Sequence, residues 1–269
     1  FRAKAEEIFN AIIDAVKKVK LNVLKDAKES GRDGGRKWEP QYDKEINYRN
    51  WNTMETVQIK MDKIFEEEFD RQLQNLFHRS SFKGNDAWAL DLKKILPNDP
   101  FCENIIFYLL TYLLGAPGFS EGRKNSKGEM KYVLCVDALE SHETLKSETP
   151  FIYPKMYILD IKLQYLRHIM IHELIHILDY QRTKIPIDEI PEPDLDPKKA
   201  PTPEQLTNYV SHPIEYNAFY QGVASSLDEF FQNSDKEVRN KYLGNFKSFY
   251  DLVMKDEKNM FMRVANDKY

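Results

Sequence analysis

The stretch at 163–180 is apolar around most of the circumference it would have as a helix, and it contains neither Gly nor Pro. Such a pattern predicts a helix enclosed in the protein interior, because a surface helix keeps one polar face toward solvent. Other elements must therefore pack around this helix in any fold of the chain. Its apolar members are Leu166, Ile169, Met170, Ile171, Leu174, Ile175, Ile177 and Leu178.

Within this predicted helix the chain reads His172-Glu173-Leu174-Ile175-His176. Residues four apart share a helix face, so both imidazoles can reach one metal ion while the Glu173 carboxylate points toward a water that the metal activates. Buried polar groups need partners, since an unpaired one costs about 1 to 3 kcal/mol. We therefore predict a Zn²⁺ site; the alternative is two core histidines that are hydrogen-bonded to the backbone.

Two further polar residues adjoin this helix face. Asp179 follows His176 by three residues, and we expect its carboxylate to accept the second N–H of a metal-binding imidazole. The alternative is a solvated Asp near the helix end, where a negative charge gains nothing from the helix dipole. His168 lies one turn before His172 with no glutamate between them, and we interpret it as a packing or hydrogen-bonding residue.

A catalytic zinc site needs a third protein ligand, which leaves one position for water. The candidates lie at 209–220, after a Pro-rich and acidic stretch at 185–203. Pro213 suits the first turn of a helix, so Glu215 would lie in that turn. We expect Glu215 to be the third ligand. His212 is the alternative ligand, and the alternative role for Glu215 is to complement the helix N-terminus.

The His-Glu-x-x-His run with Asp179, followed by a helical Glu215-x-x-Ala218, resembles the gluzincin metallopeptidases, in which a second helix supplies a glutamate as third zinc ligand. The run is also locally similar to the catalytic domain of anthrax lethal factor, which has a tyrosine shortly before its glutamate helix. Tyr209 stands in the corresponding place. The chain departs from the common gluzincin patterns because Ile214 precedes Glu215, where those patterns have Asn or Gly.

The resemblance implies zinc-dependent hydrolysis of peptide bonds, with Zn²⁺ held by His172, His176 and Glu215. Glu173 would act as general base toward the activated water and return the proton to the leaving amine. Tyr209, or otherwise His212, would donate a hydrogen bond to the oxyanion.

Two other classes of function stay open. One is a non-catalytic protein that keeps a zincin scaffold for binding or assembly, such as a component of a virion or toxin. Glu173 argues against that class, because a purely structural metal site needs no base. The other is a metal hydrolase that acts on a non-peptide amide.

Zincins also carry an antiparallel edge strand above the active-site helix, along which extended substrate pairs. Short apolar runs at 131–137 and 155–161, bounded by turn-rich stretches, predict two strands, and the second leads almost directly into the histidine helix. Pairing along a sheet edge uses backbone hydrogen bonds, so such a strand favours protein or peptide substrates. An ordinary interior strand is the alternative.

The predicted fold class is α+β and mostly helical: an N-terminal helical region at 1–114, then a zincin-like catalytic domain with a small sheet at 115–269. The Pro-rich stretch is expected to form a lid or cleft rim, with a disordered surface loop as the alternative. Periodicity and turn residues give the remaining elements. The predicted helices are 3–28, 53–79, 87–96, 101–114 and 236–254, and the predicted irregular segments are 38–51, 115–129 and 185–203.

Composition limits the partners. With 269 residues, 42% of them hydrophobic, the chain can bury a sizeable core. A net charge of −4 argues against general nucleic-acid binding, and no apolar run reaches membrane-spanning length. Cys102 and Cys135 form no ligand-spaced cluster or disulfide framework, which is typical of a reducing compartment. A chain that begins with Phe1 is typical of a processed product or a fragment.

Overall fold

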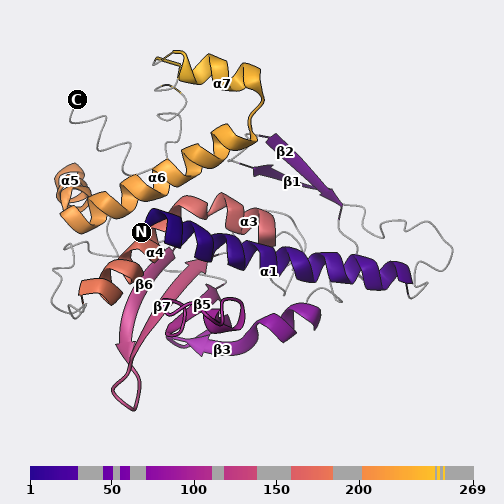
Figure 1. Cartoon of the computed structure of the whole chain (residues 1–269), viewed down its shortest axis with the longest axis vertical. Helices are drawn as coiled ribbons and strands as arrows, with labels where there is room; N and C mark the ends of the chain where they lie inside the picture. Colours follow the sequence, from indigo (N-terminus) through magenta and orange to yellow (C-terminus); the bar gives the residue numbers. More distant parts are fainter. Residues whose placement is uncertain are drawn as a thin grey trace.

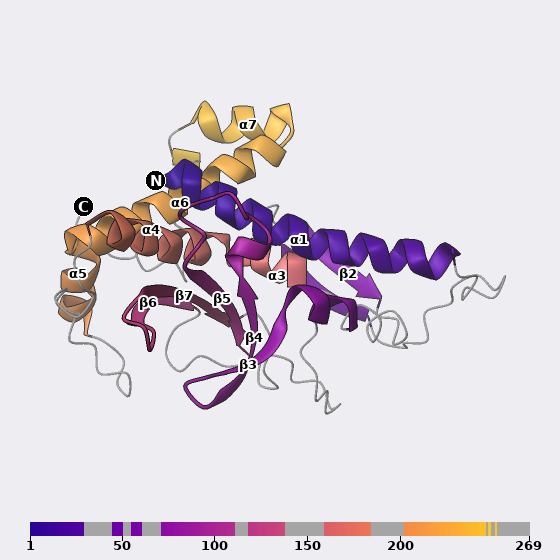
Figure 2. The same ribbon diagram turned by 60° about the horizontal axis from the view of Figure 1, so that its bottom comes forward.

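The computed structural model describes residues 1–29, 45–50, 55–60, 71–110, 118–137, 159–183, 202–245, 247–248 and 251. In these ranges the chain is an α+β protein, as predicted, and more residues lie in helices than in strands. The helices lie on one side of a five-stranded mixed sheet (Figure 1; Figure 2). No helix among the described residues combines the length and apolar character needed to cross a bilayer.

The five-stranded sheet has the order β3-β4-β5-β7-β6, so β6 forms one edge. β5 and β7 are parallel, and the other neighbouring strands are antiparallel. Lys83 and Gly84, both with positive φ, form the two-residue turn between β3 and β4, as a tight hairpin requires. The strands are β3 His78–Phe82, β4 Asn85–Asp91, β5 Ile105–Leu110, β6 Gly118–Lys124 and β7 Met130–Asp137.

Both faces of this sheet are covered. Along β5, Ile105, Phe107 and Leu109 face the helices and join the main core, whereas Leu110 belongs to a smaller cluster on the opposite face. The smaller cluster contains the buried thiol of Cys135. Because strand side chains alternate between faces, a strand covered on both sides is a continuous apolar run.

Helix α4, Arg167–Thr183, is the centre of the helical layer. It packs against β6 and β7 on one side and against α1 and α6 on the other. The predicted interior helix is thereby confirmed, although it is divided at Leu166 into α3 and α4. The helices around α4 are α1 Arg2–Glu29, α3 Leu159–Tyr165 and α6 Pro213–Asn233.

Arg167 begins α4 and is buried where α1, α4 and α6 meet. Its Nε donates to Ser225 Oγ at 3.0 Å and lies 3.2 Å from a carboxylate oxygen of Glu229. Its guanidinium lies 4.8 Å from the centre of the Phe9 ring. Burial raises the pKa of Glu229, and the nearby Arg167 charge opposes that rise. These contacts fix α1 and α6 on the same end of α4.

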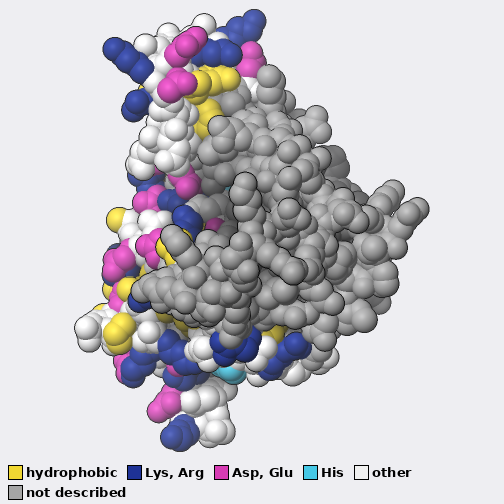
Figure 3. Space-filling view, turned by 90° about the vertical axis from the view of Figure 1, so that its right-hand side faces the viewer, with side chains coloured by type: hydrophobic (Ala, Val, Ile, Leu, Met, Phe, Trp, Pro, Cys, Tyr) yellow, Lys and Arg dark blue, Asp and Glu magenta, His cyan; other side chains and the backbone are white. Residues whose placement is uncertain are grey.

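The remaining elements are peripheral to the sheet. β1, Glu45–Asn50, and β2, Glu55–Lys60, form a separate antiparallel pair. Helix α5, Pro203–Ser211, precedes α6, and α7, Lys236–Leu243, follows it. No residue of α7 is buried, and Figure 3 shows basic and acidic side chains interspersed at the top of the molecule, where α7 lies.

Several sequence predictions are wrong, and for β4 and β5 the reason is that short apolar runs do not distinguish helix from strand. β4 and β5 are buried on both faces, so they lack the alternation that marks a half-buried strand. The sheet also contains strands from both sides of residue 114, and the N-terminal region is not wholly helical. β2 lies in the predicted helix 53–79, β4 overlaps 87–96, β5 lies in 101–114, β1 in the irregular segment 38–51 and β6 in the loop 115–129.

The other predicted elements are confirmed in whole or in part, or lie outside the described residues. The strand predicted at 131–137 is confirmed as β7, whereas the end of the strand predicted at 155–161 is helical and begins α3. Residues 155–158 and most of the Pro-rich stretch 185–203 lie outside the described residues. The helix predicted at 3–28 is confirmed as α1. The predicted closing helix begins as α7 and is interrupted after Leu243, and residues 247, 248 and 251 are helical again.

Both cysteines are free and buried. Burial raises the pKa of the Cys102 thiol to about 12 and also raises that of Cys135, so both thiols are protonated at neutral pH. Cys102 belongs to the main core and Cys135 to the cluster on the other face of the sheet.

Gly222 allows α4 and α6 to approach closely. A Cβ at this position would lie well inside van der Waals contact with the backbone carbonyl oxygen of His168. Gly222→Ala should lower the free energy of unfolding by about 1 to 3 kcal/mol, because backbone atoms cannot move aside as a flexible side chain can. Urea denaturation measures this difference.

Tyr220→Ala is the matched control for Gly222→Ala, since this side chain is on the same helix and is 52% exposed. We expect a change within about 0.5 kcal/mol for that variant. Equal stability of the wild type and Gly222→Ala would show that the two helices can separate without loss.

Candidate metal centre

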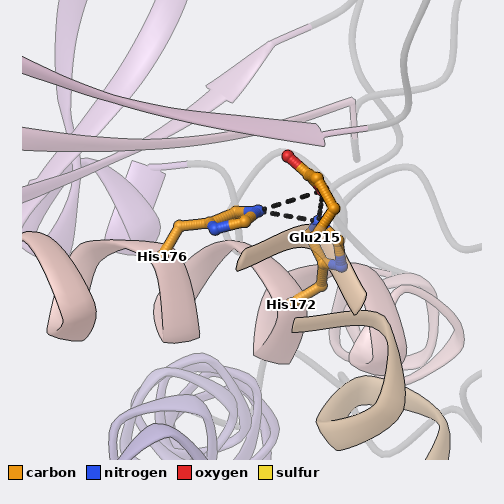
Figure 4. Close-up of side chains that lie close together, drawn as sticks. All are labelled: His172, His176 and Glu215. Atoms are coloured by element: carbon orange, nitrogen blue, oxygen red, sulfur yellow. Dashed lines mark hydrogen bonds and ion pairs between the residues drawn. The ribbon is translucent and has the colours of Figure 1, made fainter. Parts of the chain in front are cut away.

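His172, His176 and Glu215 are brought together by α4 and α6. The two imidazoles come from successive turns of α4, and the carboxylate from the first turn of α6 (Figure 4). The two Nε2 atoms are 3.0 Å apart, and Glu215 Oε2 lies 3.2 Å from Nε2 of His172 and 3.4 Å from Nε2 of His176. All three side chains are largely buried.

These separations fit tetrahedral zinc coordination. Two ligand atoms, each about 2.05 Å from Zn²⁺ at a tetrahedral angle, lie about 3.3 Å from one another. The separations in the cluster, 3.0, 3.2 and 3.4 Å, are close to that value. Two imidazole nitrogens and one carboxylate oxygen could therefore hold a zinc ion and leave a fourth position for water.

The sequence around His212 explains how Glu215 reaches the histidines. Thr202 and Gln205 form a capping box that starts α5, and His212 both ends α5 and precedes α6. Its extended backbone turns the chain between the two helices, and Pro213 occupies the first helical position. The prediction that Glu215 lies in the first turn of a helix is confirmed.

The charges within the cluster favour a cation. Burial by itself raises the pKa of Glu215, but the close approach of both histidine rings outweighs burial and holds its pKa well below the ordinary value. Burial lowers the pKa of His176, yet its hydrogen bond to Glu215 and the charges of Glu173, Glu215 and Asp179 raise it overall. A proton or a metal ion is thus stabilised between these side chains.

Glu173 lies beside the cluster without joining it. Its Oε1 is 3.9 Å from Nε2 of His172, too far for a shared ligand atom, and its Oε2 accepts a hydrogen bond from Ser120 Oγ at 2.8 Å. Glu173 is therefore free to act on a molecule bound between the histidines. Ser120 was missed by the sequence analysis because β6 had been predicted to be a loop.

Of the two predicted hydrogen-bond donors, only Tyr209 reaches the cluster. Burial, the charges of Glu215 and Glu173, and its own hydrogen bond to Glu215 all raise the pKa of the Tyr209 hydroxyl, which therefore keeps its proton. Within the described residues, His212 is outside the group that could hold a metal.

Asp179 does not make the predicted hydrogen bond to a metal-binding imidazole. Nδ1 of both His172 and His176 is buried without a hydrogen-bond partner in the described structure. Asp179 instead makes a side-chain hydrogen bond with Asn217 of α6, although its charge still acts on His176. The spacing along α4 correctly predicted that Asp179 lies near the cluster. Its partner Asn217 comes from α6, so the sequence of α4 alone could not predict that contact.

Aromatic rings enclose the two imidazoles. The Phe219 ring lies 4.2 Å from the His172 ring, and Tyr180 is stacked on His176 with 6.1 Å between centroids. Phe219 also contacts Tyr209 edge to face at 6.0 Å. Such contacts restrict ring rotation and limit the access of water. Tyr180 was also missed, although its position four residues after His176 puts it on the same helix face.

A cavity of about 890 Å³ lies at the C-terminal end of α4, beside the start of β7. Tyr180 and Gln181 line it from α4, and Lys131 and Tyr132 from β7. Tyr180 lines this cavity and is stacked on His176, whereas the cluster residues themselves do not line it. Its volume is in the range of small-molecule and side-chain binding sites.

Comparison of the chain with protein-family models, curated proteins and solved structures gives no match.

Glu215→Ala tests the third ligand. Loss of a residue that only hydrogen-bonds to a metal ligand weakens metal binding by roughly 10- to 100-fold. Removal of a ligand itself should weaken zinc binding by more than that. Elemental analysis after dialysis at limiting zinc measures the bound metal, and circular dichroism shows whether the helices persist.

His212→Ala is the control for Glu215→Ala, since His212 lies outside the group. It should retain zinc at the wild-type level. Full occupancy in Glu215→Ala together with an empty site in His212→Ala would assign the third ligand to His212.

Proposed function

We propose that this protein is a zinc-dependent metallopeptidase of the gluzincin type, which hydrolyses peptide bonds. The observation that carries the proposal is the convergence of His172, His176 and Glu215 beside the separate carboxylate of Glu173. A purely structural metal site would have no use for that additional carboxylate. The proposal includes Zn²⁺ as the resident metal and a zincin-like fold for the sheet and α4.

When bound by the two histidines and Glu215, zinc would lower the pKa of a water ligand and polarise the carbonyl of a substrate. Glu173 would accept a proton from the attacking water as the water oxygen adds to the carbonyl carbon. Glu173 next delivers the same proton to the amide nitrogen as the C–N bond breaks. Its carboxylate ends as it began, so one residue serves as base and then as acid.

Tyr209 is the proposed donor to the oxygen that gains negative charge. Its hydroxyl keeps its proton because burial and the charges of Glu215 and Glu173 raise its pKa. Its hydrogen bond to Glu215 would be exchanged for one to the substrate oxygen as charge develops there. A comparable donor stabilises a transition state by about 3 to 4 kcal/mol.

Strand β6 supports a peptide as the substrate. It is an edge strand, antiparallel to β7, and it packs against α4. An extended peptide that paired with this edge would bind through backbone groups, whatever its sequence, and would run past Glu173. This arrangement favours a peptide over an isolated amide. The strand at this edge of the sheet is β6, which was predicted to be a loop. The predicted strand at 131–137 is β7, which lies inside the sheet.

Glu173→Gln tests the general base. The amide keeps the shape of the side chain but cannot accept the proton, so turnover should fall by at least about 100-fold while zinc content and stability stay near wild type. The rate is measured on a fluorescence-quenched peptide library, and a chelator-treated sample gives the background rate. A variant with wild-type turnover would require another base.

Tyr209→Phe tests the hydrogen-bond donor. Loss of the hydroxyl should lower kcat by about 100-fold, since the interaction forms only as charge develops, and should leave KM nearly unchanged. Steady-state kinetics separate the two constants. A rise in KM at constant kcat would place Tyr209 in substrate binding instead.

A further inference from the structure

Ser120 is the third residue of β6 and lies opposite Leu134 of β7. Side chains alternate along a strand, so Ser120 shares a face with Gly118, which lies against Ile169 of α4. Phe119 points to the other face and packs in the smaller cluster. Ser120 is therefore on the side of the edge strand that faces α4 and Glu173.

The Ser120 hydroxyl holds one particular oxygen of Glu173. Oγ donates to Oε2 at 2.8 Å, and the Glu173 side chain is only 12% exposed. Oε1 is thereby left on the side of His172, 3.9 Å from its Nε2. The last torsion of a glutamate is otherwise broad and nearly two-fold, so a single hydrogen bond to one oxygen decides where the other oxygen points.

We propose that Ser120 is a positioning residue for the general base: it holds Oε2 of Glu173 so that Oε1 faces the molecule bound between the histidines. This inference rests on the proposed peptidase function. Ser120 touches neither the cluster nor the reacting atoms, and it acts through Glu173.

A hydroxyl suits both protonation states that the base must pass through. Toward the carboxylate, Ser120 donates its O–H, as the structure shows. Once Glu173 carries the proton, the Ser120 oxygen can accept a hydrogen bond from the carboxylic acid, because a hydroxyl is both donor and acceptor. The contact can persist while Glu173 takes and returns its proton, and no bond of Ser120 forms or breaks.

The experiment compares Ser120→Ala and Ser120→Thr with the wild type, all loaded with zinc. Ser81→Ala is the matched control, because it removes a hydroxyl from an exposed position of β3, the opposite edge strand. Four quantities are measured for each: kcat and KM on a quenched-fluorescence peptide, zinc affinity, melting temperature, and calorimetric affinity for acetohydroxamic acid. The affinity for acetohydroxamic acid does not depend on turnover. It still reports on the base, since this compound passes a proton to a neighbouring base as it chelates a metal.

Ser120→Ala should lower kcat by about 10- to 100-fold, the effect of a misplaced catalytic group, at unchanged KM and zinc affinity. Its affinity for acetohydroxamic acid should fall about tenfold, because the proton acceptor is no longer held in place. Ser120→Thr should restore both values, and Ser81→Ala should match the wild type in all four.

Three results would overturn the inference: a wild-type kcat in Ser120→Ala, equal losses in Ser120→Thr and Ser120→Ala, or a loss of zinc affinity as large as the loss of kcat. If the wild type cleaves no peptide, the proposed function fails. The affinity for acetohydroxamic acid then tests the positioning role of Ser120 by itself. Weaker binding by Ser120→Ala that Ser120→Thr restores supports this role, and equal binding by all variants overturns it.

Discussion

The burial of α4 is the constraint on which the rest of the structure depends. This helix has the β-sheet on one side and α1 and α6 on the other, and both cluster histidines lie in that enclosed environment. Imidazole nitrogens that cannot reach solvent need partners within the protein. Glu215 supplies a negative charge at the one point where both Nε2 atoms converge. The apolar packing that stabilises the fold thus creates a need for partners, and the cluster meets that need at the two Nε2 atoms.

The packing of α6 against α4 places Glu215 beside the two histidines. Gly222 lets its backbone approach His168 of α4, and Arg167 ties Glu229 of α6 to the start of α4. With these contacts made further along α6, the first turn of the helix reaches the histidines. The geometry of the proposed metal site therefore depends on backbone contact and a buried charge that are remote from it. A substitution that separates the two helices should weaken metal binding without touching a ligand.

Strand β6 brings a third element to the same place. The hydroxyl of its Ser120 meets Glu173, while its partner strand β7 is enclosed between the two hydrophobic clusters. The proposed base is consequently held between a helix that carries two of the proposed ligands and a strand along which a peptide could lie. Binding of substrate and orientation of the base would then share one structural element, because both involve β6.

The sequence by itself determined the interior helix, the two histidines and Glu173 on it, and the helix start that carries Glu215, because each follows from residues close together in the chain. It did not determine β4 or β5, since a run buried on both faces has the same composition in a strand as in a helix. It did not determine β6 either, because that strand is polar, contains two glycines and has the composition of a loop. Only the tertiary structure decided that Asp179 bonds to Asn217, that His212 stays outside the cluster and that Ser120 reaches Glu173. These are contacts between distant segments, and packing rather than local spacing selects them.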